Sequence, residues 1–226
     1  MFDRLRLKLV RWAFARFYSE GAWTYDAVAA LISRGYWARW IQAVRPYLHG
    51  RVLELGCGTG YLQAALASDR QRYHVGLDLS RQMLQLTRRR TARAGQEGLL
   101  VRARAQQLPF HSASFDSIVA TFPAEYIVDS ATLEEVRRAL GPGGRLLILD
   151  AGQLPPGFSR RLVNLVYALV FGRRAALPAS LPTPDPRFEL LHSAGFRVDE
   201  RWERVRESRV QVLVAEVSSC RRVTKS

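Results

Sequence analysis

A run of glycines after an apolar segment is the first feature of the chain with a chemical meaning. An apolar run ends in Leu55, glycines follow as Gly56, Gly58 and Gly60, and a helix-forming run begins at Tyr61. This pattern predicts a buried strand, a tight loop and the start of a helix. Because glycine has no Cβ, the loop can bend sharply and let a ligand approach the main chain. The spacing differs from the G-x-G-x-x-G of dinucleotide sites, and no Lys-Ser/Thr pair follows as in a P-loop.

An acidic residue follows at a distance typical of a nucleoside site. Val75-Gly76-Leu77 is a short apolar run that ends in Asp78. In βαβ nucleotide sites, an acid at the end of the second strand accepts hydrogen bonds from ribose hydroxyls. Two plainer interpretations stand beside this one. Glycines after a strand often form only a turn, and an acid at a helix N-terminus can simply be stabilised by the helix dipole.

The elements that must position these residues alternate between strands and helices. Strands are expected near 51–55, 73–78, 98–103, 115–120 and 145–150, and helices near 60–68, 80–94, 132–140 and 186–194. Ser80 is the expected N-cap of the second helix and Gly95 its end, while Thr132 and Glu135 have capping-box spacing. The alternation predicts an α/β fold with a parallel sheet and right-handed crossovers. Ligands of such sheets bind at the carboxyl ends of the strands.

Two later motifs complete a pattern known from one enzyme family. Leu108-Pro109-Phe110 precedes the fourth expected strand, and Leu140-Gly141-Pro142-Gly143-Gly144 precedes the fifth. From about Tyr47 to Asp150, the motifs in this order and spacing resemble the class I S-adenosylmethionine (SAM)-dependent methyltransferases. The resemblance implies SAM as cofactor and a Rossmann-like, seven-stranded, mostly parallel sheet with an antiparallel last strand. Strands near 196–204 and 209–217 would form its closing hairpin.

The resemblance assigns roles to residues at the carboxyl edge of this sheet. Glu54 would orient the glycine loop or the amino group of SAM, and Asp78 would hold the ribose hydroxyls. Leu79 and Met83 would pack near the adenine. Thr121 and Phe122, after the fourth strand, would border the transferred methyl. The residues implied for cofactor binding are Glu54, Gly56, Gly58, Gly60, Asp78, Leu79, Met83, Ala105, Gln106, Thr121 and Phe122.

One position departs from the family pattern. The family usually places an acidic residue, followed by Ala, before its Leu-Pro-Phe, and this acid binds the adenine amino group. Arg104 stands at that position here, followed by Ala105 and Gln106. We expect backbone groups at Ala105 or the side-chain amide of Gln106 to take over the contact.

The N-terminal region is similar to that of the ubiquinone/menaquinone-biosynthesis C-methyltransferases. Tyr25-Asp26 precedes an expected helix, and a Ser-x-Gly turn then leads into a second helix with Trp37 and Trp40. The resemblance implies a helical cap over residues 1–45 on a SAM-binding domain over 46–226. Plain core packing is the expected role of both tryptophans.

Acceptor chemistry is carried by few residues. Tyr25, Asp26 and Tyr126 are the candidates for acceptor contact and catalysis. The quinone enzymes have an Arg-Asn pair after the fourth strand, whereas this chain reads Phe-Pro-Ala-Glu from Phe122 onwards, so a quinone acceptor is not implied. None of the four histidines is placed as a general base, and no metal site is expected.

Charge and apolar segments point towards an anionic surface. The net charge is +14, which indicates nucleic acid or acidic lipid headgroups as a partner. Residues 2–18 predict a basic amphipathic helix, suited either to a membrane interface or to capping the domain. The apolar run 162–171, within an insertion over 151–184, is too short to span a bilayer. It predicts a lid over the acceptor, a membrane contact or a buried helix.

The chain has two cysteines, Cys57 and Cys220, which lie far apart in the sequence. They do not suggest a disulfide framework, and this favours a reducing compartment.

Together these features predict a SAM-dependent methyltransferase acting on a hydrophobic small-molecule or lipid-like acceptor. We expect it in the cytoplasm, at or near the inner face of the membrane. An RNA methyltransferase is the alternative that charge alone suggests, but no RNA-binding module or base-flipping motif is recognisable, so nucleic acid is not the expected partner. A SAM-binding protein without catalysis is the third possibility, because of Arg104.

Overall fold

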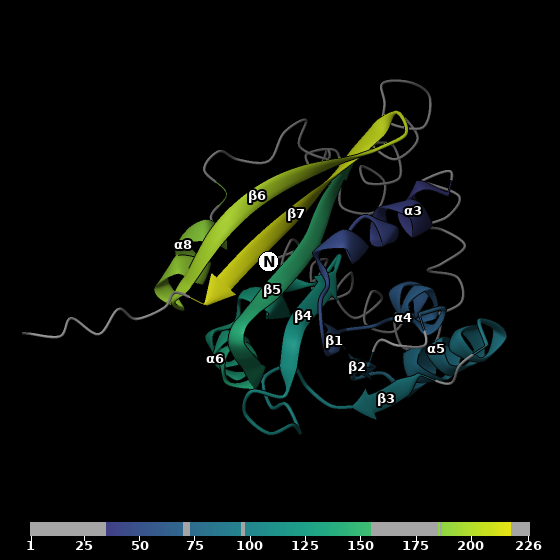
Figure 1. Ribbon diagram of the computed structural model, residues 1–226, viewed down its shortest axis with the longest axis horizontal. Coiled ribbons are helices and arrows are strands. Elements are labelled where there is room, and N and C mark those ends of the chain that lie inside the picture. Colours follow the sequence, from purple (N-terminus) through teal and green to yellow (C-terminus); the bar gives the residue numbers. More distant parts are fainter. Residues whose placement is uncertain (1–34, 70–72, 96–97, 155–184, 186, 218–226) are drawn as a thin grey trace, which may run out of the picture.

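The computed structural model describes residues 35–69, 73–95, 98–154, 185 and 187–217, which form a seven-stranded sheet with helices on both faces (Figure 1). The strands are β1 Val52–Leu55, β2 His74–Asp78, β3 Leu99–Arg102, β4 Phe115–Thr121, β5 Leu140–Gln153, β6 Phe196–Val205 and β7 Ser208–Val217. Their order is β3-β2-β1-β4-β5-β7-β6, and β7 runs antiparallel to both of its neighbours. The remaining neighbours pair in parallel. The predicted Rossmann-like sheet with an antiparallel last strand is confirmed.

Helices cover the two faces of this sheet. They are α3 Tyr36–Gln42, η1 Arg45–Tyr47, α4 Tyr61–Ala67, α5 Arg81–Arg93, η2 Glu125–Val128, α6 Ser130–Ala139 and α8 Arg187–Ser193. Successive strand residues point to opposite faces, so β5 places Leu147 and Leu149 against α3 and α4, and Leu146 and Ile148 against α6 and α8. Replacing one of these fully buried leucines by alanine would cost about 2–5 kcal/mol of folding free energy.

Helix α5 shows how the sequence directs its own packing. Met83, Thr87 and Thr91 recur every four residues and are the buried positions of the helix. The Ser80 hydroxyl accepts a hydrogen bond from the backbone N–H of Met83 at 3.3 Å, which confirms the predicted N-cap. Gly95 follows the helix with a φ of 93°, as expected of a residue that ends it.

The path of the chain brings the motif residues together. Strand β1 lies between β2 and β4, so the chain leaves β1 towards β2 and β3 and then returns to β4 on the other side. This reversal is a topological switch point, where α/β sheets bind their ligands. The carboxyl ends of the three strands, at Leu55, Asp78 and Thr121, therefore lie at one edge.

The predicted capping box of α6 is wrong. The helix begins two residues earlier, at Ser130, and its N-cap is Asp129, whose carboxylate accepts from the Ala131 N–H at 3.3 Å. The Thr132 hydroxyl is buried and has no hydrogen-bond partner among the described residues. The carboxylate of Glu135 instead accepts from the Leu108 N–H at 2.6 Å. The preceding aspartate competes successfully for the cap, a choice that spacing alone does not reveal.

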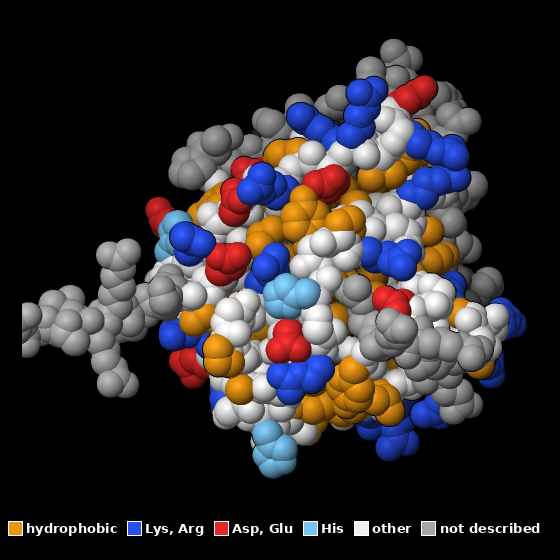
Figure 2. All heavy atoms as spheres, viewed as in Figure 1, with side chains coloured by type: hydrophobic (Ala, Val, Ile, Leu, Met, Phe, Trp, Pro, Cys, Tyr) orange, Lys and Arg blue, Asp and Glu red, His pale blue; other side chains and the backbone are white. Residues whose placement is uncertain are grey.

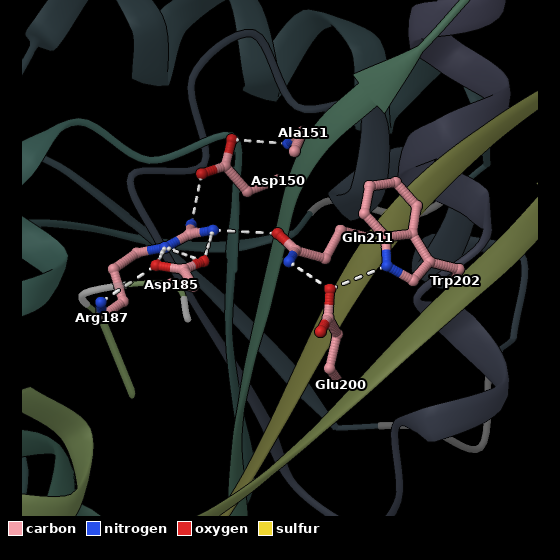
Figure 3. Close-up of polar contacts among 7 residues, drawn as sticks. All are labelled: Asp150, Ala151, Asp185, Arg187, Glu200, Trp202 and Gln211. Atoms are coloured by element: carbon pink, nitrogen blue, oxygen red, sulfur yellow. Dashed lines mark hydrogen bonds and ion pairs between the residues drawn. The ribbon is translucent and has the colours of Figure 1, made fainter. Parts of the chain in front are cut away.

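A polar cluster joins the start of α8 to the last strands of the sheet (Figure 3). The Arg187 guanidinium donates to Asp185, to Asp150 on β5 and to Gln211 on β7. The Gln211 amide in turn donates to Glu200 on β6 at 2.7 Å. Burial alone would raise the pKa of Asp185, but hydrogen bonds and charge from Arg187 outweigh it and lower that pKa.

We expect Arg187→Met to lower the free energy of unfolding by about 3 kcal/mol, because Asp185 would stay buried without its cation. Urea denaturation followed by circular dichroism measures the loss. The matched control is Arg201→Met, which breaks the exposed Arg201–Asp199 pair and should cost less than about 1 kcal/mol. Equal losses in the two variants would contradict this assignment.

Several sequence-based predictions lie outside the described residues. They are the helix at 2–18, the candidates Tyr25 and Asp26, and the apolar run 162–171. The division into a cap over 1–45 and a domain over 46–226 also stays a prediction. Within the described ranges, no helix is both long and apolar enough to cross a membrane.

Candidate active site

A cavity of about 740 Å³ opens at the carboxyl edge of β1, β2 and β4. Small-molecule sites usually measure about 300–1,000 Å³. Of the residues predicted to bind the cofactor, those that line it are Glu54, Gly56, Gly58, Asp78, Leu79, Met83, Ala105, Gln106, Thr121 and Phe122. Gly60 lies behind this lining, at the start of α4. The fold thus gathers into one cavity residues that are up to 68 positions apart, from Glu54 to Phe122.

Two side chains of α5 hold the glycine loop in place by hydrogen bonds to its carbonyl groups. The Thr87 hydroxyl donates to the Gly58 carbonyl at 2.8 Å, and the Arg90 guanidinium donates to the Thr59 carbonyl. Gly60 has a φ of 84°, and a Cβ there would come within 2.6 Å of Thr87. A Cβ on Gly58 would meet nothing closer than 3.9 Å, so the main chain there is open to the cavity.

Asp78 couples this loop to the end of β2. One carboxylate oxygen accepts from the Gly58 N–H at 2.9 Å and the other from the Ser80 N–H at 2.8 Å. Burial raises the pKa of Asp78, and these backbone hydrogen bonds partly offset it. The helix cap is supplied by Ser80, so capping does not account for Asp78. Each carboxylate oxygen has a second lone pair, and Asp78 lines the cavity, which fits a pair of ribose hydroxyls.

Glu54 is the centre of a buried polar chain that sequence reasoning missed. Its side chain accepts from the Gln63 amide at 2.8 Å and from the Thr121 hydroxyl at 3.1 Å. The other end of the Gln63 amide lies 3.0 Å from Nδ1 of His74. Glu54 is 1% exposed, and burial raises the pKa of its carboxyl to about 8, although the two hydrogen bonds oppose the rise. Burial therefore shifts Glu54 towards its protonated form.

This raised pKa makes cofactor binding depend on pH. In the empty protein, stability from protonated Glu54 is fully present below the ordinary pKa of the residue and is lost as pH rises through about 8. A cationic ligand beside Glu54 favours the carboxylate. We therefore expect SAM binding to release up to about one proton at mildly acidic pH, and its affinity to rise towards pH 8.

Titration calorimetry in buffers of different ionisation enthalpy measures this proton release. The matched variant is Glu54→Gln, which keeps the size of the side chain and cannot ionise. We expect it to bind SAM more weakly and with no proton release. An unchanged proton count in this variant would assign the release to another group.

The expected adenine end of the cavity has no acidic side chain at position 104, where the family usually places one. Arg104 is exposed at the rim, and Ala105 is buried in the lining. The Gln106 amide donates to Asp129, the N-cap of α6, at 3.1 Å. This contact already engages the Gln106 amide with α6. Of the two groups predicted to replace the acid, the Ala105 backbone is therefore the more available for adenine. Neither contact to adenine has been tested, and both stay predictions.

The opposite end of the cavity is aromatic. Trp37 stacks on Phe122 with ring centroids 4.1 Å apart, and both rings line the cavity. Core packing was predicted for both tryptophans. Trp40 is 5% exposed and donates from Nε1 to Ser208. Trp37 packs against the same core cluster and also forms part of the cavity wall. The contact joins positions 85 residues apart, and no local pattern announces it.

Tyr126 has a clear structural partner. Its hydroxyl donates to the Leu55 carbonyl at 3.0 Å. A Cβ on Gly56 would lie 2.5 Å from the Tyr126 hydroxyl oxygen. In this geometry Tyr126 positions the end of β1, and its predicted catalytic role stays a prediction. Acceptor contact by its ring stays a prediction. Among the histidines, His49 lies 3.3 Å from Ser117 at the amino end of the sheet, and His74 belongs to the Glu54 chain, so neither is placed for acid–base work.

The strand order, the glycine loop held to Asp78 and the cavity at the switch point are the arrangement expected of a SAM-dependent methyltransferase. A family model described as a methyltransferase domain matches residues 52–144. The chain is 30% identical over 201 residues to the demethylmenaquinone methyltransferase of Thermus thermophilus, covering 80% of this chain and 91% of that protein. It is also 30% identical over 202 residues to the ubiquinone/menaquinone biosynthesis C-methyltransferase of Geobacter sulfurreducens, covering 80% and 79%.

A solved SAM-dependent methyltransferase from Thermotoga maritima, described as a possible histamine N-methyltransferase, superposes with a TM-score of 0.57 and 22% identity. The match covers 86% of this chain and 95% of that one. At this identity the likeness supports the fold alone. With the sequence matches, the chain belongs to the SAM-dependent methyltransferase family that contains these demethylmenaquinone and ubiquinone/menaquinone enzymes. SAM is its cofactor.

Proposed function

We propose that this methyltransferase acts on a hydrophobic, lipid-like acceptor in the cytoplasm, at or near the membrane face. The observation that carries the proposal is the apolar half of the cavity. Its wall includes the rings of Trp37 and Phe122, which pack in one cluster with the buried Ile41 and Leu62. A large greasy ring or chain would bury against such a wall, whereas a small polar acceptor would leave it unused.

Positioning is the main work that this site has to do. SAM supplies a methyl group that its sulfonium already activates. Asp78 and the glycine loop would hold the nucleoside, and Glu54 would hold the cationic end, since it lies beside Thr121 at the end of β4. The aromatic wall would align the acceptor and exclude water around it.

A reduced demethylmenaquinone is the first acceptor to test. The relatives above are named for demethylmenaquinone and for ubiquinone and menaquinone biosynthesis. The chain departs from the quinone enzymes after β4, where Phe122 and Pro123 line the cavity in place of Arg-Asn. An aromatic wall there suits a planar ring, so the departure alters the recognition of the acceptor without removing a place for it.

The experiment incubates the purified full chain with SAM and detergent-solubilised reduced demethylmenaquinone, and in parallel with an unmodified transfer RNA. Mass spectrometry then detects added methyl groups. We expect methylation of the quinol, no RNA product, and no product from Asp78→Ala. Methylated RNA without a lipid product would reverse the assignment. SAM binding with neither product would favour the non-catalytic alternative.

A further inference from the structure

One side of the molecule carries an excess of positive charge. Between residues 79 and 107, the sequence contains seven arginines and a single acidic residue, Glu97. The exposed arginines of this stretch, which we call the basic face, are Arg81, Arg88, Arg89, Arg93, Arg102 and Arg104. They lie on α5 and on or just after the edge strand β3, which Figure 1 places at one end of the sheet. Within the described residues, none of them forms an ion pair with a carboxylate.

The opposite end of the sheet is arranged differently. On the β6–β7 hairpin, Arg197 pairs with Glu216 at 2.6 Å and Arg201 pairs with Asp199. Figure 2 shows red and blue side chains mixed over these strands. The positive charge of the described chain is thus neutralised locally on the hairpin and left unbalanced on the basic face. A one-signed surface of this kind attracts an anionic partner over a distance of about 8–10 Å at moderate salt.

The basic face is continuous with the mouth of the active-site cavity. Arg81, Arg102 and Arg104 line the cavity as well as belonging to the face. Leu79, at the same rim, is 53% exposed. Arginines around an exposed leucine suit the headgroup region of a membrane, where apolar side chains enter and guanidinium groups stay with the phosphates.

We propose that the basic face docks the enzyme on an anionic phospholipid surface, with the cavity mouth turned towards the lipid. Each arginine near such a surface adds to the attraction, and an acceptor dissolved in the membrane would then reach the aromatic wall without crossing water. RNA is less well suited to this face. The described residues between 79 and 107 include no Phe, Tyr, Trp or His on which an unpaired base would stack.

The test measures co-sedimentation of the full chain with vesicles containing phosphatidylglycerol, and with vesicles of phosphatidylcholine alone. The variant combines Arg88→Glu, Arg89→Glu and Arg93→Glu, which lie on α5 outside the cavity lining. The matched control combines Arg45→Glu, Arg204→Glu and Arg206→Glu, exposed positions away from the basic face with the same change in net charge. We expect binding to anionic vesicles to fall at least about tenfold in the variant and less than about threefold in the control. SAM affinity should be unchanged in both.

Equal losses in variant and control would overturn the proposal, because net charge alone would then explain the binding. Equal binding to the two kinds of vesicle would also overturn it, as would tight transfer-RNA binding without vesicle binding. The biological sense of this inference rests on the proposed function, but vesicle binding needs no acceptor. Quinol methylation without vesicle binding would reject the docking face alone. Vesicle binding without any methylated lipid would reject the proposed acceptor and leave the docking face standing.

Discussion

Replacing Asp78 by alanine is expected to weaken SAM binding by about 2–3 kcal/mol, or roughly a hundredfold. The substitution would remove the carboxylate that we predict to accept charge-assisted hydrogen bonds from the ribose hydroxyls. It would also leave the Gly58 and Ser80 N–H groups without the carboxylate to which they now donate at 2.9 Å and 2.8 Å. The glycine loop would then lose the contact that fixes its distance from β2. Both effects lower affinity for the same ligand, which is why this substitution should outweigh others in the cavity.

Calorimetry with SAM measures the change, and circular dichroism checks the fold. Asp78→Asn should fall between the parent and Asp78→Ala, because the amide keeps one acceptor oxygen. The control is Asp116→Ala, which removes a carboxylate at the start of β4. Asp116 pairs with Arg51 at 3.1 Å near the amino end of β4 and does not line the cavity, so SAM affinity should stay within about threefold. Unchanged affinity in folded Asp78→Ala would remove the basis of the proposed cofactor site.

The sheet and the polar half of the site were predictable because their signals are local. Apolar runs, glycines and an acid at a strand end are written in consecutive residues, and the parallel order of the first strands follows from their alternation with helices. Strand β5 shows the limit of this reasoning. It was expected over 145–150, but it extends from Leu140 to Gln153, because Leu140 pairs with Phe115 ahead of a bulge and the hairpin strand β7 prolongs its other end.

Contacts across the fold were not predictable. Gln63, Thr87 and Arg90 read as ordinary residues of helices, yet they hold Glu54 and the glycine loop. Their only signal in the sequence is a polar residue at a position that the helix buries, such as Thr87 between Met83 and Thr91. Such a position indicates that a polar group elsewhere needs a partner. It does not indicate which one, because that depends on how α4 and α5 lie on the sheet.

The aromatic wall combines an unpredicted contact with an unusual backbone. Phe122 has a φ of 47°, in the left-handed region that bulky residues rarely occupy. Its N–H donates to the Leu149 carbonyl at 2.7 Å, which continues the pairing of β4 with β5 and holds this conformation. Its ring lies 4.1 Å from the Trp37 ring and 6.1 Å from the Trp40 ring, centroid to centroid. Strain of this kind costs about 1–3 kcal/mol and persists where the surroundings impose it, often at functional sites.

Because Phe122 combines a cavity ring with a strained backbone, two substitutions at this position can distinguish a packing role from a functional role. Phe122→Ala removes the ring but keeps a side chain at positive φ, so the strain remains. Phe122→Gly removes the ring and the strain together. We expect the glycine variant to be more stable than the alanine variant by about 1 kcal/mol, measured by urea denaturation. If Phe122 were only a packing residue, recovering stability in this way would also recover activity.

We expect the opposite for turnover. Both Phe122→Ala and Phe122→Gly should lower kcat/KM for the hydrophobic acceptor by about a hundredfold, because a ring that aligns the acceptor is lost in each. SAM affinity should change by less than about threefold, since Asp78, Glu54 and the glycine loop are untouched. Phe122→Leu, which keeps an apolar wall without a flat ring, should keep part of the turnover. Normal turnover in Phe122→Gly would assign the ring to packing alone, and a parallel loss of SAM affinity would assign it to the cofactor. A stable, SAM-binding, inactive glycine variant would mean that turnover needs the Phe122 ring itself and not the stability that its packing provides.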